Sequence, residues 1–143
     1  MSKKLVIAGP VMMDDSLSRC HLSWLVSDYL YKHYDFNEPS TIICAPDTIT
    51  GYYARKWAEK HSVRFSSHIA FQKNTAHEYE VAKLYEDRIS GDMREAIVRR
   101  NMSMMAEEGI HKVLLFNSAS ECGDFILAAR SKPETIDIVR ILV

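Results

Sequence analysis

Short apolar runs alternate along this chain with longer segments in which apolar residues recur every three or four positions. Short runs rich in β-branched residues predict buried strands, and the wider spacing predicts helices with one apolar face. The predicted strands are residues 4–8, 41–45, 63–65, 112–116 and 136–142, and the predicted helices are about 16–36, 50–61, 75–89, 93–108 and 123–129.

The predicted strands and helices alternate, and the strands are continuously apolar. This pattern indicates a parallel sheet that helices cover on both faces. We therefore expect an α/β fold with a Rossmann-like, mostly parallel sheet of about five strands. The length suits one domain, 1–143, with a helical insertion near 72–92. Such sheets bind ligands beyond the carboxyl ends of their strands, so the candidate loops are 9–15, 45–51 and 117–123.

Composition and charge narrow the classes of partner. A net charge of -1 disfavours bulk nucleic-acid binding. The apolar run 5–8 is too short for a signal-peptide core and no stretch approaches a membrane span, so we expect a cytoplasmic protein without a membrane partner. Three cysteines without paired spacing predict buried free thiols, and the histidines lack metal-ligand spacing. Neither a metal site nor a cofactor is expected.

Polar side chains in or near the candidate loops could bind a small molecule. The guanidinium of Arg100 and the amide of Asn101 suit phosphate or ribose oxygens, although Arg100 could equally lie on a solvated helix face. Hydroxyls at strand-to-helix turns can hold an anion together with free helix N–H groups, or they can simply cap helices. The candidate ligand-binding residues are Gly9, Pro10, Asp15, Thr48, Thr50, Gly51, Arg100, Asn101, Asn117, Ser118 and Ser120.

Four segments of the chain share their residue pattern with one known family. They are Lys4–Gly9 with Asp15, Ala54-Arg55-Lys56-Trp57-Ala58 with Val63–Phe65, Arg100-Asn101-Met102-Ser103-Met104, and Leu114–Asp124 with Ala129-Arg130. On these motifs the chain resembles the SLOG superfamily, particularly its small YspA-like branch, related to the LOG and DprA Rossmann-like domains. The resemblance implies a domain that senses or processes nucleotide-derived signals, often in conflict between phages and bacteria.

The same resemblance marks two acids as candidate catalytic residues. Asp124 stands at the position of the acid that assists N-glycosidic bond cleavage in the enzymatic relatives, and Glu121 lies three residues earlier. Either carboxylate could instead simply favour the start of a helix. The family's glycine-rich turns are replaced here by Ala45–Gly51 and Ser118–Gly123. These replacements favour a binding protein over an enzyme.

Three functional hypotheses follow. The first is a protein that senses or sequesters a nucleotide-derived small molecule. The alternative is an N-glycosidic-bond enzyme of phosphoribohydrolase or nucleoside deoxyribosyltransferase type, and a further alternative is a protein-interaction module that uses the inserted helix. We also expect a homo-oligomer, because methionines near residues 93–105 and apolar residues of the insertion add apolar area beyond a small core; the latter are Tyr79, Tyr85 and Ile89.

Overall fold

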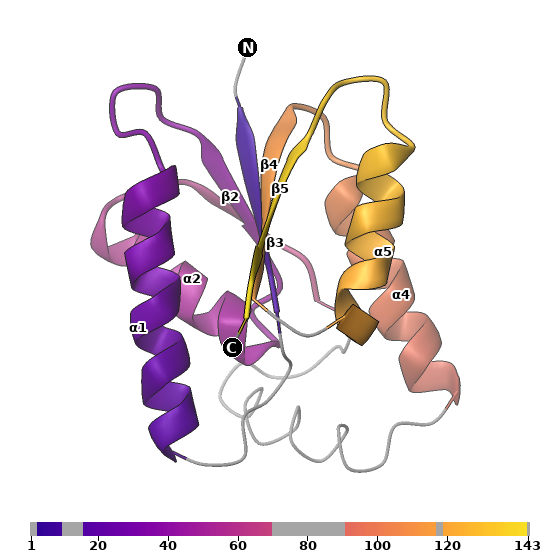
Figure 1. Ribbon diagram of the computed structural model, residues 1–143, viewed down its shortest axis with the longest axis horizontal. Coiled ribbons are helices and arrows are strands. Elements are labelled where there is room, and N and C mark those ends of the chain that lie inside the picture. The colour runs from indigo at the N-terminus through magenta and orange to yellow at the C-terminus, as the bar shows by residue number, and fades with distance from the viewer. Residues whose placement is uncertain (1–2, 10–15, 70–90, 117–118, 143) are drawn as a thin grey trace.

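The described part of the chain forms a parallel five-stranded sheet. The computed structural model describes residues 3–9, 16–69, 91–116 and 119–142 (Figure 1). The strands lie in the order β3-β2-β1-β4-β5, and every neighbouring pair is parallel. The expected α/β fold is therefore confirmed. The strands are β1 (Lys4–Ala8), β2 (Thr41–Cys44), β3 (Phe65–Ser67), β4 (Ile110–Phe116) and β5 (Asp137–Ile141).

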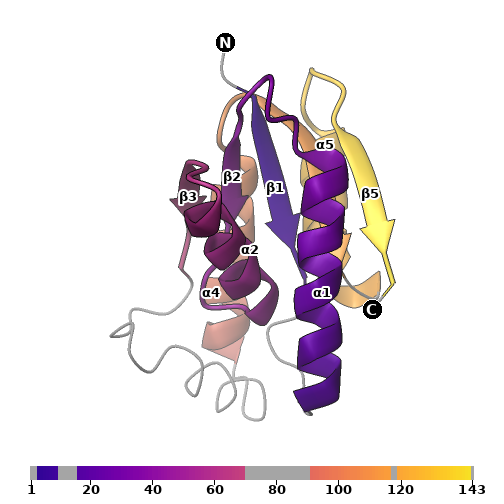
Figure 2. The same ribbon diagram turned by 90° about the vertical axis from the view of Figure 1, so that its left-hand side faces the viewer.

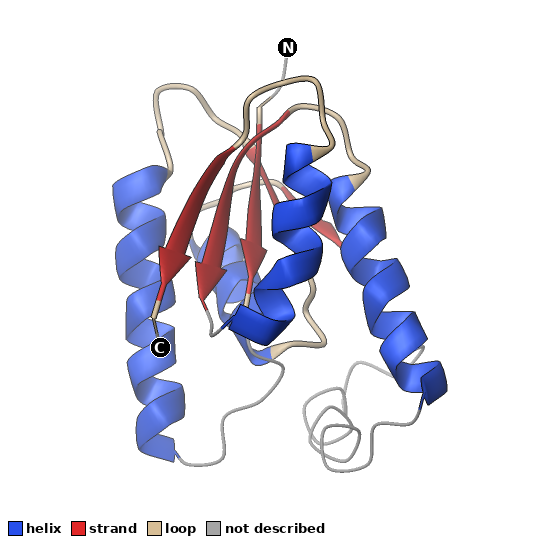
Figure 3. Ribbon diagram, turned by 45° about the vertical axis from the view of Figure 1, so that its right-hand side comes forward, coloured by secondary structure: helices blue, strands red, loops and turns tan. Residues whose placement is uncertain are grey.

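Helices cover both faces of this sheet, as the continuous apolar strands predict. One pair lies in front of the strands in Figure 2 and the other pair lies behind them, and Figure 3 shows the sheet as the middle layer. The front pair is α1 (Ser16–His33) and α2 (Ile49–Lys60), and the other pair is α4 (Gly91–Met105) and α5 (Ala119–Arg130).

Alternate residues of the central strands build two separate apolar cores. Leu5 and Ile7 of β1 face α1 and α2, where they pack in a cluster with Leu22 and Trp57. Val6, the residue between them, belongs to the cluster under α4 and α5. A strand that is buried on both faces must be apolar at every position, which is why β1 shows no polar alternation.

The observed boundaries differ from the predicted ones mainly at β3 and at α5, which begins at Ala119 and not at Gly123, so most of the candidate loop 117–123 belongs to the helix. The strand begins at Phe65 and not at Val63, because the amide of Val63 donates to the carbonyl of Ala58 and so closes the turn after α2. Val63 itself is buried in the core, which accounts for its apolar character. The predicted helix 75–89 lies outside the described residues, as does most of the expected insertion.

The cysteines only partly follow the prediction of buried free thiols. Cys44 is buried in β2, and burial raises the pKa of its thiol to about 12, so it stays protonated. Cys20 is exposed on α1, so the prediction is wrong for that residue, while the side chain of Cys122 is not described.

No helix among the described residues is long and apolar enough to span a membrane.

The sheet places a switch in strand order beside the candidate loops. From β1 the chain moves to β2 on one side, and the later strand β4 lies on the other side of β1. Gly9 directly follows β1 at this point. A Cβ atom on Gly9 would overlap the hydroxyl of Thr50 and come within 2.8 Å of the carbonyl oxygen of Phe116. Gly9 therefore allows β4 and the start of α2 to approach the end of β1.

Gly51 provides a first test of this packing. A Cβ atom there would overlap the carbonyl oxygen of Ala45, so Gly51→Ala should lower the free energy of unfolding by about 1–3 kcal/mol. Gly123, inside α5, has open space around the same atom, and Gly123→Ala should raise that free energy by roughly 0.5–1 kcal/mol. Urea denaturation of both variants measures the two effects. Equal effects of the two substitutions would contradict the close approach at Gly51.

Candidate functional site

A buried polar cluster lies near the C-terminal edge of the sheet. It joins Asp47, in the loop after β2, to Arg100 and Asn101 of α4 and to Asp124 of α5. Arg100 Nη1 donates to Asp47 Oδ1 at 3.3 Å, and Arg100 Nε and Nη2 donate to Asn101 Oδ1 at 3.2 and 2.9 Å. Asn101 Nδ2 donates to Asp124 Oδ2 at 3.2 Å. We call these four residues the polar cluster.

The charged pair of the polar cluster is deeply buried. The side chains of Arg100 and Asp47 are 6% and 4% exposed. Their mutual attraction must therefore offset the loss of water around both charges. The alternative in which Arg100 lies on a solvated helix face is wrong, whereas its neighbour Arg99 is exposed. A ligand-binding role for Arg100 stays a prediction.

Asn101 connects the charged pair to Asp124 in a fixed orientation. A guanidinium has only donors, so the atom of Asn101 that faces Arg100 must be the amide oxygen. The NH₂ group then points to Asp124, where it donates to the carboxylate. Asp124 is half-buried, so it is the member of the polar cluster that is most open to solvent.

Thr48 caps helix α2, which is one of the two roles that the sequence predicts for it. Its hydroxyl oxygen accepts from the amide of Gly51 at 2.9 Å and donates its proton to the carbonyl of Ala45 at 2.7 Å. One amide at the start of α2 is thus bound by the protein itself. Thr50, in the same turn, is fully buried.

The remaining candidate residues are placed only in part. Ser120 and Glu121 lie in the first turn of α5, but their side chains are not described. Sequence reasoning missed Asp47 as a site residue. An acid shortly after a strand, inside a candidate loop, was the available signal, but its partner is 53 positions away in the sequence. The candidates outside the described residues are Pro10, Asp15, Asn117 and Ser118.

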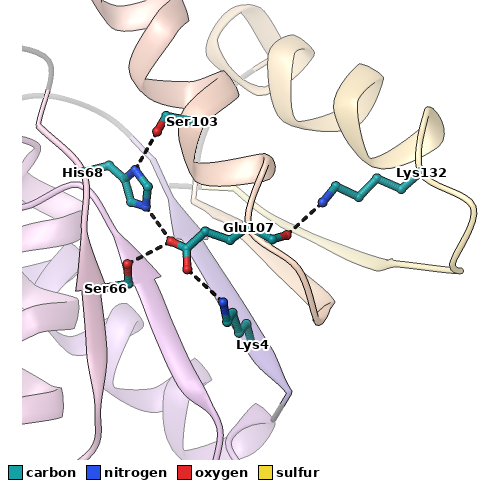
Figure 4. A network of polar contacts seen from close by, with 6 residues as sticks. All are labelled: Lys4, Ser66, His68, Ser103, Glu107 and Lys132. Carbon is teal, nitrogen blue, oxygen red and sulfur yellow. Dashed lines mark hydrogen bonds and ion pairs between the residues drawn. The ribbon is translucent and has the colours of Figure 1, made fainter. Parts of the chain in front are cut away.

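A second polar group, the Glu107 network, lies at the C-terminal end of α4 (Figure 4). The carboxylate of Glu107 accepts from His68 Nε2 at 2.5 Å, from Ser66 Oγ at 2.8 Å and from Lys4 Nζ at 3.1 Å. Ser103 Oγ lies 3.0 Å from His68 Nδ1. Lys132, before β5, donates to the backbone oxygen of Glu107 at 2.9 Å. The network holds the end of α4 against β1 and β3.

The Glu107 network predicts acid sensitivity. Burial alone would raise the pKa of Glu107, but its hydrogen bonds to His68, Ser66 and Lys4 outweigh burial and hold the pKa below the ordinary 4.5. A lowered folded-state pKa stabilises the fold above the unfolded-state pKa, and this stabilisation is lost as the pH falls through the folded-state value. Glu107→Gln removes the titration, so its stability should fall less steeply than that of the parent between about pH 5 and about pH 3.

Urea denaturation at a series of pH values measures this difference. Glu108→Gln is the matched control, because Glu108 is the exposed neighbour of Glu107 and changes the net charge equally. The control should keep the slope of the parent. Parallel pH curves for Glu107→Gln and the parent would show that the network contributes nothing to acid sensitivity.

The polar cluster allows a direct test of its charged pair. Arg100→Met breaks the buried ion pair by removing the guanidinium that meets Asp47, and it should lower the free energy of unfolding by about 3–5 kcal/mol. Arg99→Met, on the exposed neighbour, should change it by no more than about 0.5 kcal/mol. The double variant Arg100→Met, Asp47→Leu should recover much of the loss, since no buried charge remains. Thermal or chemical unfolding measures all three, and similar losses at positions 99 and 100 would refute the buried pair.

Comparisons with known proteins do not assign the chain to a family. No protein-family model, curated protein or solved structure matches it. The resemblance to the SLOG superfamily therefore stays a prediction.

Among the described residues, no three His, Cys, Asp or Glu side chains gather in a way that could hold a metal ion.

Proposed function

We propose that the protein binds a nucleotide-like small molecule beside the polar cluster and senses or sequesters it. The observation that carries this proposal is the buried charged pair of Arg100 and Asp47, linked through Asn101 to the half-buried Asp124. The cluster lies near the C-terminal edge of a parallel sheet, where open α/β folds bind their ligands. The SLOG resemblance points to the same class of ligand.

The stability of the fold alone is a weak reason for burying the charged pair of Arg100 and Asp47. Well-packed apolar residues often stabilise a core as well as a buried ion pair does, or better. The polar cluster instead fixes the orientation of Asn101 and, through it, of Asp124. A carboxylate held in one orientation at a half-buried position is typical of a binding site.

A second candidate function is cleavage of an N-glycosidic bond. The contact that favours it is the hydrogen bond from Asn101 to Asp124, because glycosyl chemistry needs a fixed carboxyl group beside the anomeric carbon. We prefer the binding function, since the loops lack the glycine-rich turns of the related phosphoribohydrolases.

Mass spectrometry of small molecules released from the purified, denatured protein tests the binding function. We expect a nucleotide-like compound to be released from the parent protein. Incubation with nucleoside monophosphates, NAD-derived cyclic nucleotides and deoxynucleosides then separates the two functions. A binding protein returns each compound unchanged. Release of free base by the parent, but not by Asp124→Asn, would establish the enzymatic function instead.

The same proposal includes two further expectations, that copies of the chain associate with one another and that the protein is cytoplasmic. Val98 and Met102 lie one turn apart on α4 and are 44% and 51% exposed, whereas Met104 and Met105 are buried in the core. The exposed pair offers apolar area for a contact between copies. Light scattering should give a mass well above 16.4 kDa, and the mass of a single chain would exclude the homo-oligomer.

A further inference from the structure

The guanidinium of Arg100 is already committed to partners within the protein. Three of its hydrogen bonds go to Asp47 and Asn101. A phosphate that recruited Arg100 would take it from Asp47 and break the buried ion pair. It would also bring a second anion next to the carboxylate of Asp47. Arg100 is therefore better suited to hold the site together than to receive a phosphate.

One amide at the start of α2, the other expected anion-binding device, is also bound from within the protein. A helix N-terminus binds phosphate through its free amides. Here Thr48 accepts from the amide of Gly51, and its own proton goes to Ala45. Gly51 in turn packs so closely against Ala45 that even a Cβ atom would overlap the carbonyl oxygen. These contacts close this turn of α2 around its own cap.

Asp124 has the opposite character, since it can only accept hydrogen bonds. The amide of Asn101 donates to Oδ2, and the bonds from Arg100 fix the orientation of that amide. An ionised carboxylate has about four lone-pair sites, and Asp124 is half-buried. The complementary groups on a ligand are hydrogen-bond donors, such as the hydroxyls of a ribose or an amino group.

The charges around the site favour the same kind of ligand. Two carboxylates and one guanidinium give the polar cluster an excess of one negative charge. A phosphate group entering beside the polar cluster would therefore meet repulsion.

We infer that the site recognises the uncharged, nucleoside-like part of its ligand, through donors that bind Asp124, and discriminates against a phosphate group. This inference rests on the proposed function and narrows it to a ligand class. A 5′-phosphate lowers the affinity, and a free hydroxyl or amino group at the same place does not.

Calorimetric titration of the full chain with matched pairs of ligands tests the inference. The probes are adenosine, guanosine, cytidine and uridine, each beside its 5′-monophosphate, together with inorganic phosphate. At least one nucleoside should bind about tenfold or more tightly than its monophosphate, which corresponds to about 1.4 kcal/mol. Inorganic phosphate should not compete with it.

Two variants identify the groups that set this preference. Asp124→Asn keeps the shape but removes the charge, so it should reduce the preference for the nucleoside about tenfold. Glu134→Gln changes the net charge equally at an exposed position in the loop between α5 and β5, at the opposite edge of the sheet, and should leave the preference unchanged. Asp47→Asn releases Arg100 from its carboxylate and should increase the affinity for the monophosphate. Circular dichroism checks the fold of each variant. If Asp47→Asn does not fold, the affinities of Asp124→Asn alone decide the test.

The outcomes separate this inference from the proposed function. Tighter binding of a monophosphate, or competition by inorganic phosphate, overturns the nucleoside preference while it supports a nucleotide-like ligand. An unchanged preference in Asp124→Asn refutes the role of its carboxylate. If neither series binds to the folded parent, and no nucleotide-like compound is released on denaturation, both the inference and the proposed function fail.

Discussion

Arg100 carries a permanent positive charge into the space between α4 and the sheet, and Asp47 is the carboxylate that meets it there. Burial at this depth costs each side chain less free energy when the other is present. The pair therefore ties the middle of α4 to the loop after β2. Asn101, the next residue of α4, follows from this constraint, because its amide oxygen must face the guanidinium and its NH₂ group must face Asp124. The geometry of the candidate site thus depends on one ion pair.

The same helix is held at its far end by a different kind of contact. Glu107 gathers donors from β1, β3 and the residue that follows β3, all on the face that α4 and α5 cover (Figure 4). This network is less deeply buried than the Arg100 pair, with side-chain exposures of 18–23% for Lys4, His68 and Glu107, so water and pH act on it more readily. The middle of α4 is therefore fixed by a pair shielded from solvent, and its C-terminal end by a network that responds to acid.

Groups that usually bind phosphate are present in this fold but serve the fold itself. Arg100 neutralises Asp47, and Thr48 caps α2. A site can contain an arginine and a helix N-terminus without being built for an anion, since what matters is the donors that the protein leaves to the ligand. Asp124, which is half-buried and held in one orientation, gives the proposed site an accepting and negatively charged character.

The sequence by itself determined the fold class and most element boundaries, because strands buried on both faces must be continuously apolar and helices with one buried face must repeat every three or four residues. It also brought Arg100, Asn101 and Asp124 forward as candidates by their chemistry and by their resemblance to a family. Only the tertiary structure decided what these residues contact. The partner of Arg100 is 53 positions away in the sequence, and pairing between such distant residues depends on how α4 packs over the sheet. Local sequence patterns do not show how α4 packs over the sheet, so Asp47 was missed as a site residue. For the same reason the sequence allowed Arg100 to lie on a solvated helix face, which its burial excludes.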